Sequence, residues 1–207
     1  SPDIIVITGD LVDSNHTDID TALSFVRQAA KIAPSYYVTG NHEAWLVNPY
    51  AELESQLLEA GVTVLHDKVI SLSKDEDSIQ LIGLDDPDFT DGSSYDPERL
   101  FENKLQNMDL EPGFTILLSH RPELFPAYSA SGIDLILSGH AHGGQFRIPL
   151  LGGVVAPNQG FFPKYDAGEY HESGTTMIVS RGIGNSVIPV RINNRPEVVM
   201  IELVSEE

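Results

Sequence analysis

The stretch Ser138–Gln145, SGHAHGGQ, follows directly on the apolar run Ile133–Leu137 and contains two histidines one residue apart. Residues i and i+2 of an extended chain point in the same direction, so both imidazole rings can face one point. The flanking glycines allow the backbone to turn sharply and to approach a ligand closely. A metal centre uses all of these properties and a loop with two solvated histidines uses none, but eight residues alone leave both interpretations open.

Strand-like apolar runs alternate with amphipathic helical runs through the first two-thirds of the chain, and this alternation predicts an α/β fold. The predicted strands cover 4–8, 36–39, 62–72, 79–84, 114–118 and 133–137, and the predicted helices cover 17–30, 48–61 and 96–107, with a short helix after Pro122. Beyond residue 145 the helical periodicity disappears, and short strands are expected at 146–148, 175–180 and 198–203. Because no linker or repeat interrupts the pattern, we predict a single domain over residues 1–207.

Four of the predicted strands end in side chains that bind metals or move protons. The strands are followed by Gly9-Asp10, Gly40-Asn41-His42-Glu43, Ser119-His120 and Ser138-Gly139-His140. Any one of these is weak by itself, because Gly-Asp is usually a turn and a lone histidine is usually a hydrogen-bonded polar group. In open α/β sheets, however, the carboxyl ends of the strands face a common crevice in which ligands bind. Together they predict one site at this edge of the sheet.

The side chains at these strand ends have a consistent ligand chemistry. One carboxylate, one amide oxygen and several imidazoles suit Mn, Fe or Zn, and the chain has no cysteine that could form a disulfide or a thiolate site. Asp10 can bridge two ions, and the neutral oxygen of Asn41 leaves the pair positive enough to attract phosphate. Two ions about 3.5–4 Å apart are a recurrent arrangement for in-line displacement at phosphorus.

The charge of the chain limits its partners. Twelve basic and thirty-one acidic residues give a formal net charge of −19, which does not favour a groove that follows a nucleic-acid backbone. The apolar runs are far shorter than the roughly 20 residues that cross a bilayer. Length and composition fit one globular domain with a substantial core and leave the cellular compartment and the oligomeric state open.

In this order, the four blocks resemble the calcineurin-like metallophosphoesterase superfamily, whose pattern is D-x-H, G-D, G-N-H-[DE], H and G-H-x-H. The resemblance covers the whole chain and implies a four-layer α/β/β/α sandwich with two mixed sheets. The tails SGHAHGGQFRIP and VSRGIGNSVIPVR also resemble a bacterial subgroup, often membrane-anchored, that includes hydrolases of UDP-diacylglucosamine-type lipid A precursors.

The resemblance implies roles for individual residues. It places one metal site at Asp10, Asn41, His120 and His140, and the other at Asp10 and His142. It makes His42 the general acid that protonates the leaving oxygen, and Asp13 the carboxylate that orients His42. Related protein phosphatases have a phosphate-binding arginine after the equivalent of Asp13; here the residue is Ser14, so a phosphoprotein substrate is not expected.

The function implied is hydrolysis of a phosphomonoester, phosphodiester or pyrophosphate by a metal-bridging hydroxide. We expect a small-molecule or lipid-linked substrate and no nucleic acid, and two divalent transition metals (Mn, Fe or Zn) in the intact enzyme. The alternative is a non-catalytic metal-binding or scaffolding domain derived from the same fold.

One block of the pattern is missing, because no Asp-x-His precedes Asp10. An engineered or proteolytic fragment, a truncated gene product and a genuine non-enzyme all explain this. We favour an N-terminally truncated enzyme whose first strand is missing and whose intact form can be anchored to a membrane by an upstream segment. For the chain as it stands, we expect little activity and at most one tightly bound ion, held by Asp10, Asn41, His120 and His140.

Further polar and aromatic residues carry weaker predictions. Arg121, Arg147 and Arg181 follow strand ends or glycine loops, and we consider them as contacts to the substrate phosphate. Trp45 is expected to pack over the start of a helix rather than to contact substrate. His16, His66 and His171 are interpreted as surface histidines.

Overall fold

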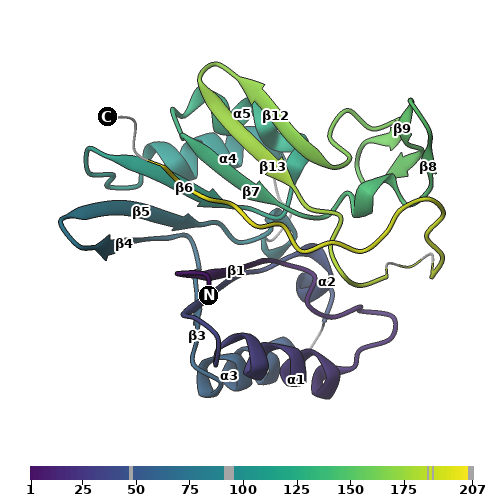
Figure 1. Ribbon diagram of the computed structural model, residues 1–207, viewed down its shortest axis with the longest axis horizontal. Helices are drawn as coiled ribbons and strands as arrows, with labels where there is room; N and C mark the ends of the chain where they lie inside the picture. The colour runs from purple at the N-terminus through teal and green to yellow at the C-terminus, as the bar shows by residue number, and fades with distance from the viewer. Residues whose placement is uncertain (47–48, 91–95, 186, 188, 205–207) are drawn as a thin grey trace.

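The computed structural model describes residues 1–207 apart from 47–48, 91–95, 186, 188 and 205–207, and two β-sheets face each other in it (Figure 1). The small sheet has the strand order β1-β2-β3, and the large sheet has the order β12-β13-β7-β6-β5-β4. The bounds are β1 Ile5–Thr8, β2 Ser35–Val38, β3 Val62–Val64, β4 Lys68–Lys74, β5 Asp77–Gly83, β6 Phe114–Leu118, β7 Leu135–Ser138, β12 Gly168–Glu172 and β13 Thr175–Val179.

Helices cover the outer faces of both sheets, which gives four layers. Helices α1 (Ile19–Ala29) and α3 (Pro49–Glu59) pack against the small sheet, and α4 (Pro97–Gln106) and α5 (Phe125–Ala130) pack against the large one. The predicted four-layer α/β/β/α sandwich is therefore confirmed. One detail differs: the large sheet is mixed, whereas β1, β2 and β3 are all parallel.

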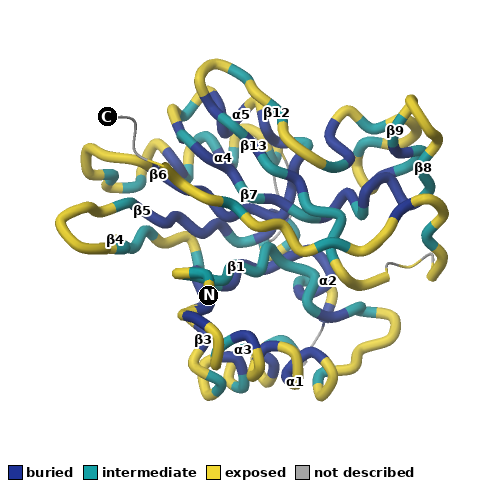
Figure 2. The backbone as a smooth tube through the Cα atoms, viewed as in Figure 1, coloured by how far each residue is buried: buried dark blue, intermediate teal, exposed yellow. Residues whose placement is uncertain are grey.

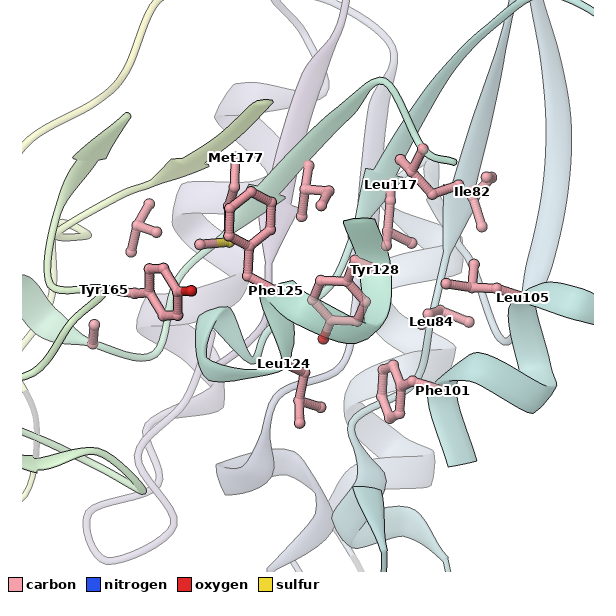
Figure 3. Close-up of a cluster of buried hydrophobic side chains, with 14 of the residues drawn as sticks. Ile82, Leu84, Phe101, Leu105, Leu117, Leu124, Phe125, Tyr128, Tyr165 and Met177 are labelled. Atoms are coloured by element: carbon pink, nitrogen blue, oxygen red, sulfur yellow. The ribbon is translucent and has the colours of Figure 1, made fainter. Parts of the chain in front are cut away.

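Alternation along the strands explains how two sheets share one core. In β6, Ile116 and Leu118 face the small sheet, and Leu117 faces the helices on the other side. Period-two alternation of this kind buries both faces of a central strand. Figure 3 shows the outer cluster, which includes Leu117 and in which the rings of Phe101 of α4 and Tyr128 of α5 lie next to each other, with centroids 5.8 Å apart.

Two predicted strands differ from those observed. The run 62–72 is divided between β3 in the small sheet and β4 in the large sheet, because the chain turns at Asp67, which has a φ of 46°. The predicted strand 198–203 has no ladder partner in the described part of the chain, and only Ile201 of this segment packs into the core between the sheets.

The predicted helices are present, with small changes at their ends. Asp18, and not Thr17, caps α1 by accepting a hydrogen bond from the backbone of Thr21, and Asp96 caps α4 as expected from Asp-Pro. Asn48, predicted to open the next helix, lies outside the described residues. Within the described ranges, no helix combines the length and the apolar character needed to cross a membrane.

The topology determines where functional side chains gather. The carboxyl ends of β1, β2, β6 and β7 meet at one end of the two sheets, next to the short helix α2 (Asn41–Ala44). Beyond β7 the chain forms small ladders, β8 (Arg147–Ile148) with β9 (Gly152–Gly153) and β10 (Val155–Ala156) with β11 (Gly160–Phe161). These ladders lie beside the strand ends (Figure 1).

Candidate metal centre

Four side chains that follow strand ends converge on one point. Nε2 of His120 lies 3.0 Å from Oδ2 of Asp10, 3.2 Å from Oδ1 of Asn41 and 3.0 Å from Nδ1 of His140. Two ligand atoms that bind one ion at right angles, each about 2.1 Å from it, lie roughly 3.0 Å apart. The structure thus brings together the four side chains that the family resemblance assigned to one ion, at a spacing that fits such an ion.

The electrostatics of the cluster favour a positive charge among its donor atoms. Nδ1 of His120 lies 2.6 Å from the carbonyl oxygen of Thr8 and donates to it, so Nε2 is the nitrogen that faces the other three side chains. Burial opposes a charge on His120, but the carboxylate of Asp10 raises its pKa to about 9. Burial would raise the pKa of Asp10, but the charge of His120 holds it well below its usual range. A cation is favoured where these atoms meet.

Glycines allow the strand-end loops to approach each other. A Cβ atom on Gly40 would lie 2.3 Å from Oδ1 of Asp10, and one on Gly9 would lie 2.6 Å from the backbone nitrogen of Gly40. Asp10 and His140 themselves have left-handed backbone, with φ of 51° and 61°. Such residues persist only where their surroundings hold them, and they concentrate at functional sites.

Glu43 holds the loop that carries Asp10. Its side chain is fully buried and accepts four backbone N–H groups, from Gly40 at 2.7 Å, Asp10 at 2.9 Å, Leu11 at 2.8 Å and Val12 at 3.3 Å. Burial and the charge of Asp10 raise the pKa of Glu43 to about 7, against these donors, which lower it. Both oxygens of Glu43 are thus occupied in positioning backbone.

His42 lies on the pocket side of Asp10. Its backbone N–H donates to Oδ1 of Asp10 at 3.0 Å, and its ring lines the pocket. Nδ1 accepts the backbone N–H of Ser14 at 3.0 Å and lies 2.9 Å from the Ser14 hydroxyl, whereas the carboxylate of Asp13 is 3.6 Å away. The neutral ring therefore carries its proton on Nε2. Ser14, rather than Asp13, makes the direct hydrogen bonds to this ring.

His142 is separate from the four-donor cluster. The donor atoms of Asp10, His120 and His140 lie within 4.8 Å of one another, and His142 is not part of that group. Burial is the main cause that lowers the pKa of His142 to about 4, and nearby positive groups, Arg191 among them, contribute. Its ring is therefore neutral near pH 7 and offers a lone pair.

The cluster borders a pocket of about 990 Å³. Part of the lining is apolar, with Trp45, Val155, Pro157 and Val187, and part is acidic, with Asp88, Asp96, Glu98 and Glu123. Trp45 was predicted to pack over the start of a helix. Its ring does lie against His42 of α2, with centroids 5.0 Å apart, but the side chain is also 52% exposed and lines the pocket.

The three arginines considered for phosphate binding are all paired with carboxylates. Arg121 is buried and donates to both oxygens of Asp86 at 2.6 and 2.7 Å; Arg147 pairs with Asp166 at 2.8 Å, and Arg181 with Glu197 at 3.3 Å. These pairs do not support the predicted role. Across the described parts of the chain, Arg191 has no carboxylate partner within 4.0 Å, and its Nε and Nη1 atoms are buried without hydrogen bonds.

His66 is not an isolated surface histidine. Its Nδ1 lies 2.9 Å from Asp85 and its Nε2 lies 3.0 Å from Glu54, so it joins α3 to the end of β5. The hydrogen bond with Asp85 is the main cause that raises the pKa of His66 to about 9. His171, by contrast, is exposed, as predicted.

Comparison with known proteins decides the family. Residues 1–144 match the family model described as calcineurin-like phosphoesterase. The chain belongs to this family. Membership indicates a hydrolase of phosphoesters that uses divalent metal ions, and the cluster around His120 supplies a matching ligand set.

Individual relatives of this calcineurin-like phosphoesterase carry names that agree with the family assignment. The chain is 30% identical to the uncharacterized metallophosphoesterase YkuE of Bacillus subtilis, over 99% of this chain and 68% of that protein. It is 31% identical to the phosphodiesterase YaeI of Escherichia coli, over 98% and 71%. It is 33% identical to a transmembrane protein with metallophosphoesterase domain from Danio rerio, over 98% of this chain but only 46% of that one.

A solved structure supports the fold. The sulfate thiohydrolase SoxB of Thermus thermophilus superposes on 85% of this phosphoesterase, and on 33% of its own chain, with a TM-score of 0.56 at 17% identity. At this identity the likeness concerns the fold alone.

Proposed function

We propose that this protein is a metal-dependent phosphoesterase that hydrolyses a small or lipid-linked phosphomonoester, phosphodiester or pyrophosphate. One observation carries the proposal: four donor atoms meet at His120 with metal-ligand spacing, beside a pocket that the ring of His42 lines. A cluster of polar groups that only stabilises the fold needs no access to a pocket. Hydrolysis needs a metal-ligand cluster and a pocket that admits the substrate to it.

Each side chain has a task in this proposal. Asp10, Asn41, His120 and His140 hold one ion, and His142 contributes with Asp10 to a second. When bound, the ions stabilise the charge on the phosphoryl oxygens and lower the pKa of water that attacks phosphorus. His42 presents Nε2 to the leaving oxygen as general acid. A second proton on its ring would lie on Nδ1, where the Ser14 hydroxyl and Asp13 are the acceptors within reach.

The pocket lining bears on the substrate. The carboxylates of Asp88, Asp96, Glu98 and Glu123 oppose polyanions such as nucleic acid, and the apolar lining from Trp45 to Val187 suits a group without charge. Arg191 is the group we propose for contact with a non-bridging phosphate oxygen, because it lacks a carboxylate partner and its charge acts on His142. A single phosphoester next to an apolar group fits this lining.

The test is metal-dependent turnover. The chain is dialysed against a chelator, reloaded with Mn²⁺, Fe²⁺ or Zn²⁺, and assayed with bis(4-nitrophenyl) phosphate and 4-nitrophenyl phosphate. We expect a slow release of nitrophenol, in keeping with the little activity expected of the chain as it stands, that requires metal and disappears in His120→Ala. Stoichiometric metal binding without hydrolysis of either ester would instead identify the protein as a metal-binding or scaffolding domain.

A further inference from the structure

We propose that this protein docks on an anionic lipid bilayer through its apolar lobe, defined as residues 146–162 together with the described residues of 183–192. The inference concerns binding and does not depend on hydrolysis. It rests on exposure, backbone conformation and charge in this lobe.

The apolar lobe contains the most exposed large apolar side chains near the pocket. Leu150 is 106% exposed and Leu151 69%, at the turn between β8 and β9; Phe161 is 78% exposed and Phe162 62%, at the end of β11. Single exposed apolar residues are ordinary on protein surfaces, but two adjacent pairs on neighbouring ladders are a concentrated feature. Figure 2 shows the exposed backbone around β8 and β9.

Backbone conformation marks the same residues. Eleven described residues other than glycine have positive φ, and only Leu150 (71°) and Phe162 (52°) among them are apolar. Left-handed backbone is uncommon for a residue with a bulky side chain and costs free energy, which functional segments tolerate. Both side chains point into solvent, so burial within this chain does not offset that cost.

Hydrogen bonds make the lobe one unit. The backbone nitrogen of Arg147 donates to Ile192 at 2.9 Å, Phe162 donates to Val154 at 2.8 Å, and the side chain of Gln145 donates to Val190 at 2.8 Å. These bonds join both ladders to the segment after β13. Exposed side chains of Ile148, Val190 and Ile192 therefore belong to the same part of the molecule as Leu150 and Phe162.

The charge of the apolar lobe indicates an anionic lipid as its partner. Residues 135–165 and 173–196 contain none of the thirty-one acidic residues of the chain but five of its twelve basic ones. Of these, Lys164, Arg191 and Arg195 form no ion pair with a described carboxylate. Two carboxylates from outside these ranges contact the lobe, and both are occupied: Asp166 pairs with Arg147, and Glu123 accepts a hydrogen bond from Asn158. An apolar surface with unpaired basic residues is a pattern that binds anionic lipid, where each basic residue near the surface adds attraction.

The lobe also has a position that suits a membrane substrate. Val155, Pro157 and Val187 line the pocket, and they lie within the lobe itself. A bilayer that covers Phe161 and Phe162 would therefore lie beside the segment 155–158, which lines the pocket. A second copy of the chain is less favourable, because a twofold contact would oppose like charges.

The experiment uses vesicles. The chain is sedimented with phosphatidylcholine vesicles that contain an equal share of phosphatidylglycerol, and with phosphatidylcholine alone. We expect binding to the anionic vesicles that weakens as salt rises. The double variant Leu150→Ser/Phe162→Ser should bind at least about tenfold more weakly, since it removes two large apolar side chains. The matched control is Val198→Ser/Met200→Ser, which removes two side chains that are 82% and 76% exposed elsewhere.

Each outcome decides the proposal. Equal weakening by both double variants, unchanged binding of the lobe variant, or no binding of the native chain at low salt would overturn it. Light scattering distinguishes the other occupant: self-association that the lobe variant abolishes, without vesicle binding, would assign the surface to a second copy. Circular dichroism confirms that both variants remain folded.

Discussion

The metal-ligand cluster and the apolar lobe border the same pocket, and both contain side chains on left-handed backbone. In the cluster these are Asp10 and His140, which internal hydrogen bonds and burial hold in place. In the lobe they include Leu150 and Phe162, whose side chains are 106% and 62% exposed. The cluster is thus stabilised by contacts within the chain, whereas the lobe leaves large apolar side chains exposed in the described structure. We therefore expect the effect of substitutions on hydrolysis of a soluble ester to fall from the cluster outward.

The largest effect is expected for His120→Ala. This change removes the nitrogen that the other three donors face, so tight metal binding should be lost. Turnover should fall about 10³-fold or more, because the ions supply several kcal/mol of charge stabilisation. Elemental analysis after dialysis and initial rates measure both effects. His171→Ala, which removes an exposed histidine, is the control and should change neither; normal metal content in His120→Ala would break the assignment of the cluster.

The next effect separates chemistry from metal binding. His42→Ala should retain metal and lose about 10²–10⁴-fold in turnover, because only proton transfer to the leaving oxygen is removed. Ser14→Ala should have a smaller effect, since the carboxylate of Asp13, 3.6 Å from Nδ1, remains as an acceptor for the proton on that nitrogen. Native turnover in His42→Ala would exclude this residue from the mechanism.

Glu43→Gln tests whether the carboxylate of Glu43 positions the loop that carries Asp10. Glutamine offers one acceptor oxygen where Glu43 offers two, so backbone donors of the Asp10 loop are left unpaired. We expect metal affinity to fall about 10–100-fold and the free energy of unfolding to fall by about 1–3 kcal/mol. Metal titration and denaturant unfolding measure these changes. If both stay native, the loop holds its conformation without this carboxylate.

Arg191→Gln tests whether Arg191, which lies in the apolar lobe, contacts the substrate phosphate. If Arg191 contacts substrate phosphate, KM should rise about tenfold while kcat changes little, because uniform binding is lost. Arg181→Gln is the matched control, since Arg181 is paired with Glu197. An equal rise of KM in both variants would point to a general effect of charge.

The smallest effect is expected at His66, which belongs to neither region. Its folded-state pKa is raised to about 9, so its contribution to stability is fully present below its unfolded-state pKa of about 6.5 and is lost as pH rises through 9. The difference in unfolding free energy between the native chain and His66→Gln should be at most about 1 kcal/mol near pH 6 and vanish near pH 10. A difference that grows with pH would contradict the ion pairs with Asp85 and Glu54.

Much of the cluster could be predicted because its side chains follow strands that can be recognised locally. Asp10, Asn41, His120 and His140 come one or a few residues after apolar runs, and parallel strands bring their carboxyl ends to one edge. The roles of Glu43 and Ser14 could not be predicted in this way. These roles depend on which backbone N–H groups of the 10–14 loop lie within hydrogen-bond distance of the side chains of Glu43 and His42. The spacing of residues along the sequence does not encode these distances.

The arginines show the same limit. Arg121, Arg147 and Arg181 follow strand ends or glycine loops, but the carboxylates that accept their hydrogen bonds are 16 to 35 residues away along the chain. Whether a cation is compensated depends on packing between distant segments. Arg191, by contrast, has no carboxylate within 4.0 Å in the described part of the chain.

The sequence by itself determined the α/β class, the alternation of strands and helices up to β7, and the chemistry gathered at the strand ends, because hydrophobic periodicity and residue type act locally. The short strands β9 to β12 were not predicted. Tertiary structure alone decided how the run 62–72 was divided between the two sheets, since a left-handed turn at Asp67 separates β3 from β4. It also decided which polar groups are paired and which apolar side chains stay exposed. Those properties depend on contacts between segments far apart in the chain, and the free energy of such contacts exists only once the sheets have packed.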